Sequence, residues 1–242
     1  MFNFRRSALS LAILAIVTLS SAVATKADTV TFVTPSGAST GGGPVSARAV
    51  LTVNPAGTLT VVLTNLQANP TDVAQLISDF SFTTTGAPTG TLTGSSGQQI
   101  NVLANGTTTL GSTVATGWGL DSNTGGSFHA TALCGGCVGP AGLIIGPPGA
   151  GGIYTAANGS IAGNAPHNPF LNQTATFTLT IPGLTSVSQI TSFTFSFGTV
   201  AGVNVPGTPG VPEPASMVLL GTGLVSVAAG LRRRRKSRKE EL

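Results

Sequence analysis

Four side chains in this sequence could bind a transition metal or carry out thiol chemistry. They are Cys134 and Cys137, which are the only cysteines, and His129 and His167, which are the only histidines. Two cysteines and two histidines would suit zinc if they converged. Redox chemistry would need the first cysteine at a helix N-terminus, and Gly135-Gly136 argues against a helix there. The simplest prediction is a disulfide between Cys134 and Cys137 in an oxidising compartment, with no metal or other cofactor.

Two further motifs resemble functional loops, but each lacks a required part. The G-x-S-x-G pattern of an esterase, with Ser39 as nucleophile, occurs at residues 37–41, yet Gly42-Gly43-Pro44 cannot begin the helix that this motif needs. Residues 121–126 resemble the start of a calcium loop, but Ala132 stands where the bidentate acid belongs. We therefore predict a flexible glycine loop at the first motif and an Asx-type turn between strands at the second.

Few other residues point to a substrate. Trp118, Tyr154 and His167 could line a sugar-binding face, since exposed aromatic rings stack on sugars; for Trp118 the alternative is burial in the core. A metal-dependent hydrolase is the least supported class, because Glu213 is the only Glu before the basic tail and the body therefore has no pair of Glu residues. We predict that the protein is not an enzyme.

Alternation of apolar and polar residues predicts strands through most of the chain. In the clearest, residues 174–181, apolar side chains line one face and threonines the other. Residues 45–53 and 59–63 repeat the pattern around Asn54-Pro55-Ala56-Gly57, which predicts a hairpin with a type I turn. Other strands are expected at residues 79–84, 89–93, 100–103, 107–114 and 190–197. The predicted fold is all-β, an antiparallel β-sandwich of jelly-roll or immunoglobulin-like type.

Three segments are expected to interrupt these strands. Thr71 can cap one short helix that runs to Ser78. Glycine and proline are too dense in residues 135–152 for regular structure, which predicts a long loop. Residues 202–211 are expected to form an extended Gly/Pro linker. The body of the protein should therefore occupy residues 28–201.

Both ends of the chain carry targeting features. Arg5 and Arg6 precede an apolar stretch and then small residues, which predicts a secretory signal peptide with its helix in residues 1–27. Residues 215–231 are uncharged and would reach ~26 Å as a helix, slightly short of a ~30 Å hydrocarbon core. A C-terminal transmembrane helix is expected here. The basic residues of segment 232–239 would hold that end in the cytoplasm as a membrane stop: Arg232, Arg233, Arg234, Arg235 and Lys236.

Charge is concentrated in these end segments. Of the 11 Lys and Arg residues, Arg48 alone lies between Asp28 and Pro212, where it faces four Asp residues and leaves a net charge of −3. A body with one basic side chain cannot neutralise a row of phosphates. We therefore expect no nucleic-acid partner, and we expect the body to lie across the membrane from both basic ends.

The tail resembles the PEP-CTERM sorting signal. The resemblance rests on Val211, Pro212, Glu213 and Pro214, the apolar run and the basic stop, and the signal proper is placed at residues 212–239. It implies transient anchoring in the inner membrane and processing by an exosortase-type membrane protease. From the residues alone, an ordinary anchor that is never cut is the alternative.

The predicted function combines export with this resemblance. We expect signal peptidase and the general secretion machinery to act first, and the mature protein to be a non-catalytic component of the cell surface or extracellular matrix. The resemblance implies a biofilm setting with exopolysaccharide as a partner. The alternative of another class is a carbohydrate-binding or adhesive module of that matrix.

Overall fold

The computed structural model describes residues 27–54, 57–87, 89–162 and 167–210. Most of them lie in strands, which confirms the all-β prediction. The strands are β1 (Asp28–Val33), β2 (Ser39–Thr40), β3 (Gly43–Pro44), β4 (Ala47–Asn54), β5 (Thr58–Asn65), β6 (Ile77–Thr84), β7 (Thr91–Val102), β8 (Thr108–Val114), β9 (Gly119–Thr124), β10 (Ser127–Thr131), β11 (Ile144–Ile145), β12 (Phe170–Thr180), β13 (Ile190–Phe197), β14 (Asn204–Pro206) and β15 (Thr208–Pro209). Short 3-10 helices are η2 (Val73–Gln75), η3 (Gly139–Gly142) and η4 (Val187–Gln189).

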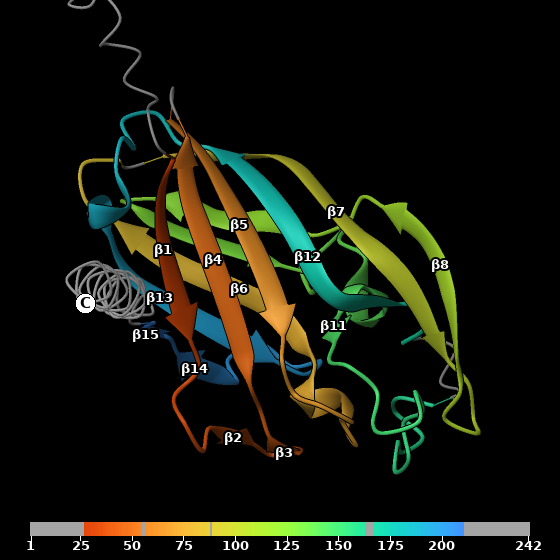
Figure 1. Cartoon of the computed structure of the whole chain (residues 1–242). Helices are drawn as coiled ribbons and strands as arrows, with labels where there is room; N and C mark the ends of the chain where they lie inside the picture. Colours follow the sequence, from red (N-terminus) through yellow and green to blue (C-terminus); the bar gives the residue numbers. More distant parts are fainter. Residues whose placement is uncertain (1–26, 55–56, 88, 163–166, 211–242) are drawn as a thin grey trace, which may run out of the picture.

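One hydrogen-bonded sheet of 13 strands folds into two layers that face each other (Figure 1). The front layer has the order β15-β1-β4-β5-β12-β7-β8, and the back layer has the order β14-β13-β6-β10-β9. Strand β11 joins the layers, because it pairs antiparallel with β6 and parallel with β12. The prediction of a purely antiparallel sheet is wrong at this parallel pair.

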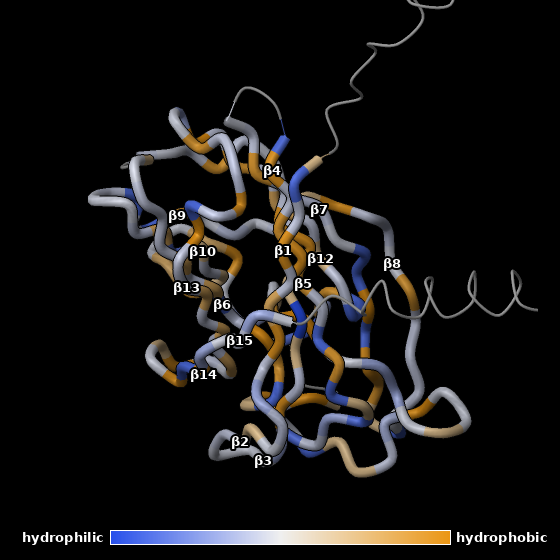
Figure 2. The backbone as a smooth tube through the Cα atoms, turned by 60° about the vertical axis from the view of Figure 1, so that its left-hand side comes forward, coloured by the Kyte–Doolittle hydropathy of each residue, from blue (hydrophilic) through white to orange (hydrophobic). Residues whose placement is uncertain are grey.

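The core lies between the two layers and is rich in phenylalanine. Strict alternation sends Phe80 of β6 and Phe177 of β12 inward, where neither is exposed and their ring centroids lie 5.1 Å apart. Phe32 of β1 stacks on Phe193 of β13 at 5.5 Å, which joins the layers a second time. Figure 2 shows hydrophobic and polar residues alternating along the strands. Burying each such ring contributes about 1.5–3 kcal/mol.

The β4–β5 hairpin is confirmed, with Ala49 opposite Leu63. The helix expected at residues 71–78 is wrong, since η2 is a single 3-10 turn. Asp72 rather than Thr71 caps it, and the Gln75 side chain accepts the backbone N–H of both Thr71 and Asp72. Strand β6 then begins at Ile77, because its alternating residues pair with β13 and β10.

Other differences come from pairings between distant segments. The strands expected at 89–93 and 100–103 are one strand, β7. The strands that were not predicted include β1, β9 and β10 and the short pair β2 and β3. The loop expected at 135–152 contains η3 and β11, whose Ile144 and Ile145 are fully buried. The linker expected at 202–211 instead contributes β14 and β15, which pair with β13 and β1.

The chain crosses from the back layer to the front layer between β14 and β15. Gly207 makes this crossing over the core, where a Cβ atom would lie only 3.0 Å from the Phe195 ring. Beyond β15, the Gly210 N–H donates to the Thr31 carbonyl at 2.7 Å. The root of the C-terminal tail is therefore bound to strand β1. Among the described residues no helix is long and apolar enough to span a membrane; the predicted signal helix and residues 215–231 lie outside them.

Candidate functional site

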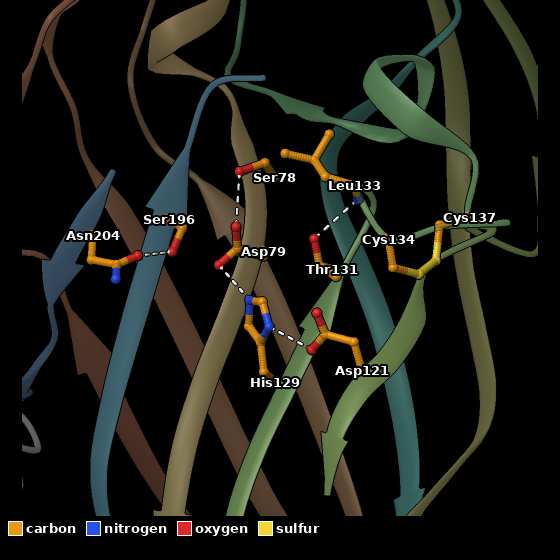
Figure 3. Close-up of polar contacts among 10 residues, drawn as sticks. All are labelled: Ser78, Asp79, Asp121, His129, Thr131, Leu133, Cys134, Cys137, Ser196 and Asn204. Carbon is orange, nitrogen blue, oxygen red and sulfur yellow. Dashed lines mark hydrogen bonds and ion pairs between the residues drawn. A yellow bond between two sulfur atoms is a disulfide. The ribbon is translucent and has the colours of Figure 1, made fainter. Parts of the chain in front are cut away.

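The ion pairs of the described chain meet at one histidine on the outer face of the back layer. His129 Nε2 lies 3.1 Å from Asp79 Oδ1, and His129 Nδ1 lies 2.6 Å from Asp121 Oδ1 (Figure 3). We name this group the Asp79–His129–Asp121 cluster. Its three residues come from adjacent strands, β6, β10 and β9.

Strand alternation sets the direction of two of these side chains. Phe82 of β6 and Phe128 of β10 stack in the core with ring centroids 4.9 Å apart. Because successive residues point to opposite faces, Asp79 and His129 lie on the outer face. In the register, Asp79 is opposite Thr131, so the His129 ring reaches it diagonally across the two strands.

Asp121 joins the cluster through a β-bulge. The β9–β10 register shifts so that His129 is opposite Ser122 while Ala130 is opposite Leu120. Asp121 is the extra residue of β9 at this point, and a bulge residue can be aimed away from the regular alternation. The bulge therefore places a second carboxylate beside an imidazole that already contacts Asp79.

The two carboxylates differ in burial. The Asp79 side chain is 4% exposed, whereas that of Asp121 is 42% exposed. The Ser78 hydroxyl donates to Asp79 Oδ2 at 3.2 Å, which satisfies the other carboxylate oxygen. The hydrogen bond to Asp79 is the main cause that raises the pKa of His129, and the charges of both carboxylates add to it against the opposing effect of burial. The protonated imidazole then donates from both nitrogens.

This arrangement pairs an imidazole with two carboxylates and brings no nucleophile to it. Both ring nitrogens of His129 are engaged by carboxylates, and Ser78 donates to Asp79 instead of contacting the imidazole. A hydrolytic triad needs a nucleophile within hydrogen-bond reach of its base. Within the described ranges, no three His, Cys, Asp or Glu side chains gather in a way that could hold a metal ion.

The four residues considered for zinc are not brought together as ligands. A disulfide joins Cys134 and Cys137, whose Cα atoms are 5.1 Å apart (Figure 3). His167 Nδ1 lies 2.6 Å from the Ser160 carbonyl oxygen, away from the aspartates that hold His129. Gly119 makes room for the disulfide, since a Cβ there would lie 2.7 Å from each sulfur.

The aromatic residues considered for sugar binding are buried. Trp118 is 5% exposed and its Nε1–H donates to the Gly142 carbonyl at 2.8 Å. Tyr154 is 2% exposed, its hydroxyl donates to the Gly146 carbonyl at 2.7 Å, and burial raises its pKa. The predicted stacking face is therefore wrong for these two rings, and burial is correct for Trp118.

The two loop motifs also have other roles. Ser39 lies in β2, which pairs with β3 instead of feeding a helix, and its hydroxyl donates to the neighbouring Thr40 carbonyl. Residues 121–126 form the end of β9 and a turn through Gly125 and Gly126, both with positive φ, before β10. That hairpin geometry suits glycine and needs no calcium ion.

Sequence reasoning missed Asp79 as a site residue. Its local signal was an aspartate in the expected strand 79–84, where Phe80 and Phe82 alternate with polar residues. That alternation indicates an outward-facing carboxylate, but its histidine partner lies on a strand fifty residues later that was not predicted.

The sorting motif lies outside the described residues and is established by sequence comparison. Residues 210–235 match the family model of the PEP-CTERM protein-sorting motif. The chain carries a PEP-CTERM sorting signal. This match includes Val211, Pro212, Glu213, Pro214 and the four arginines from Arg232.

PEP-CTERM proteins of this kind are exported, transiently anchored at the membrane and processed by exosortase, a membrane protein. Searches of curated proteins and of solved structures found no match to the chain.

Proposed function

We propose that this protein is an exported, non-catalytic component of the cell surface or extracellular matrix, processed at its PEP-CTERM tail. The observation that carries the proposal is the sorting motif at residues 210–235, which begins where a folded β body ends. We infer that residues 215–231 span the membrane as a helix until exosortase cuts the tail, and that the two-layer body works as a β-sandwich scaffold.

Several features of the body support a non-catalytic role. The ionisable side chains of the Asp79–His129–Asp121 cluster contact one another, so that both ring nitrogens of the imidazole are engaged by carboxylates. The cysteines form a disulfide, which suits an oxidising compartment outside the cytoplasm. A body with a net charge of −3 and a hydroxyl-rich surface suits a structural or adhesive component of a matrix.

The test is replacement of the sorting motif. Pro212→Ala, Glu213→Ala and Pro214→Ala together should leave the apolar segment able to insert but unable to be processed, so that the protein accumulates in the inner membrane. Glu240→Ala with Glu241→Ala is the matched control, since these residues lie in the tail beyond the motif and should not affect sorting. Mass spectrometry of surface and membrane fractions measures the outcome.

Two results would contradict the proposal. Normal arrival of the motif variant at the surface would favour a simple membrane anchor. Peptides that contain the basic run from Arg232 in released wild-type protein would show that the tail is not removed. Either result leaves the description of the body unaffected.

A carbohydrate-binding or adhesive module is the second candidate. The outer face of the front layer favours it, because threonines lie opposite one another on β5 and β12 there, with Arg48 of β4 as the one charged side chain on the face. Such a hydroxyl-rich surface with a single charge would suit a neutral polysaccharide. Binding to a glycan array, abolished by Thr60→Val with Thr178→Val, would support this candidate.

A further inference from the structure

Strand β8 is an edge of the front layer that the rest of the described molecule leaves open. It pairs with β7 alone, and Figure 1 shows it at the margin of the sheet. Residues 109–113 are all exposed, and Leu110 is 62% exposed. An edge strand presents unpaired backbone N–H and C=O groups, so its outer side is a template for another strand.

The other edges of the described sheet are protected. β14 and β15 are short and end at Pro206 and Pro209, and β15 covers part of β1. β9 contains Asp121, and its Asn123 side chain donates across to the Gly90 carbonyl at 3.0 Å. Proline, charge, shortness, a β-bulge and a covering segment are the usual means by which native proteins prevent edge-to-edge pairing.

Of those protections, strand β8 has only a bulge. The chain contains no charged residue from Phe80 to Leu120, and β8 contains no proline. Its one irregularity is a bulge, where Gly111 and Ser112 together face Gln99 of β7. A bulge increases local twist, which limits the straight part of this edge to a few residues on either side.

We propose that a second copy of this chain occupies this edge, with the two β8 strands antiparallel about a two-fold axis. Only another extended backbone complements alternating N–H and C=O groups. Two identical strands meet symmetrically when they are antiparallel, which closes the assembly as a dimer. Like charges directly opposite would destabilise such a pair, whereas threonine and serine opposite one another stabilise it. The composition of β8 therefore suits self-pairing.

The expected affinity of this dimer is low. Stable interfaces bury about 1,200–2,000 Å² in total, and one pair of short strands buries less than that. A larger fraction of the protein pairs where copies are held close together, because confinement raises their effective concentration above the dissociation constant. A protein delivered to a surface meets that condition. The inference is independent of how the tail is processed.

Amide hydrogen exchange of the full chain in mild detergent tests the proposal. Raising the protein concentration should slow exchange in β8 by about tenfold while leaving the central strand β12 unchanged. Leu110→Lys with Thr113→Lys should abolish the concentration dependence: both residues lie on the same face of β8, on either side of the bulge, so the two-fold axis places the added charges of one copy opposite those of the other. Thr176→Lys with Thr180→Lys adds the same charge to a strand paired on both sides and should behave as wild type.

The readout is local, so association through the apolar tail does not imitate it. Sedimentation velocity on the same samples reports the size of any assembly. The proposal is overturned if wild-type β8 exchanges at the same rate at all concentrations, or if a dimer forms without protection of β8. It is also overturned if the β8 double variant, with an unchanged melting temperature, keeps the wild-type protection.

Discussion

The polar side chains on the outer faces of the two layers differ in charge and in the partners that they contact. On the front layer, threonines lie opposite one another in adjacent strands, and the Thr64 and Thr174 hydroxyls are 3.3 Å apart. On the back layer, one imidazole is shared by two carboxylates, one of them almost fully buried. Neutral hydroxyl pairs contribute little and cost little, whereas a buried carboxylate is costly unless it is paired. We therefore expect the free energy of unfolding to depend more on charged residues of the back layer than on polar residues of the front layer.

The largest effect is expected from Asp79→Ala on the back layer. It should lower the free energy of unfolding by about 2–4 kcal/mol, because it leaves the buried Ser78 hydroxyl without its acceptor and the His129 imidazole with the exposed Asp121 as its remaining carboxylate. Denaturant unfolding measures the loss. Asp121→Ala is the control, and it should cost less than about 1 kcal/mol because that carboxylate is exposed. Equal costs for the two variants would contradict the comparison.

The disulfide that follows β10 gives the back layer a further local constraint. Cys134→Ser with Cys137→Ser should cost about 1–2 kcal/mol, since so short a loop restricts the unfolded chain only slightly. Exchange of amides near residues 132–145 should accelerate while β12 stays protected. Before reduction, alkylation of the native protein should find no free thiol. Global unfolding of the double variant would show that the disulfide supports the whole fold.

Near neutral pH, the pH dependence of stability should come from the back layer. The raised pKa of His129 means that its protonation contributes stability that is fully present below about pH 6.5 and is lost as the pH rises through the folded pKa. Solvent screening of the half-exposed ring should keep this loss below about 1 kcal/mol. His129→Gln should remove it, as seen in unfolding curves at several pH values. A wild-type stability that rises over this window would refute the assignment.

The smallest effect is expected on the front layer. Thr176→Val with Thr178→Val removes two hydroxyls from central strand β12 and keeps the β-branched shape, so stability should change by less than about 0.5 kcal/mol at any pH. Thermal melting at two pH values measures this. A loss of stability comparable to that caused by Asp79→Ala would show that the threonines form a cooperative network. The two faces would then not differ in their contribution to stability.

Local patterns predicted the strands best where one face is core and the other is solvent. Residues 174–181 alternate strictly, and residues 190–197 alternate from Ser192 onward; they correspond to strands β12 and β13 in the structure. The helix at residues 71–78 failed because the apolar spacing that suggested it belongs to a 3-10 turn followed by a strand. Strands β14 and β15 were missed because proline and glycine dominate them locally and only pairing with β13 and β1 makes them strands.

The sequence by itself determined the export and sorting features, the all-β class and the low charge of the body. These depend on contiguous residues: the motif from Val211, the basic run from Arg232 and the alternation within each strand. Tertiary structure alone decided that Asp79, Asp121 and His129 meet and that β8 remains open. A diagonal contact across strands depends on register and on a bulge, and an open edge depends on which strands pair, so neither is encoded in any short stretch of residues.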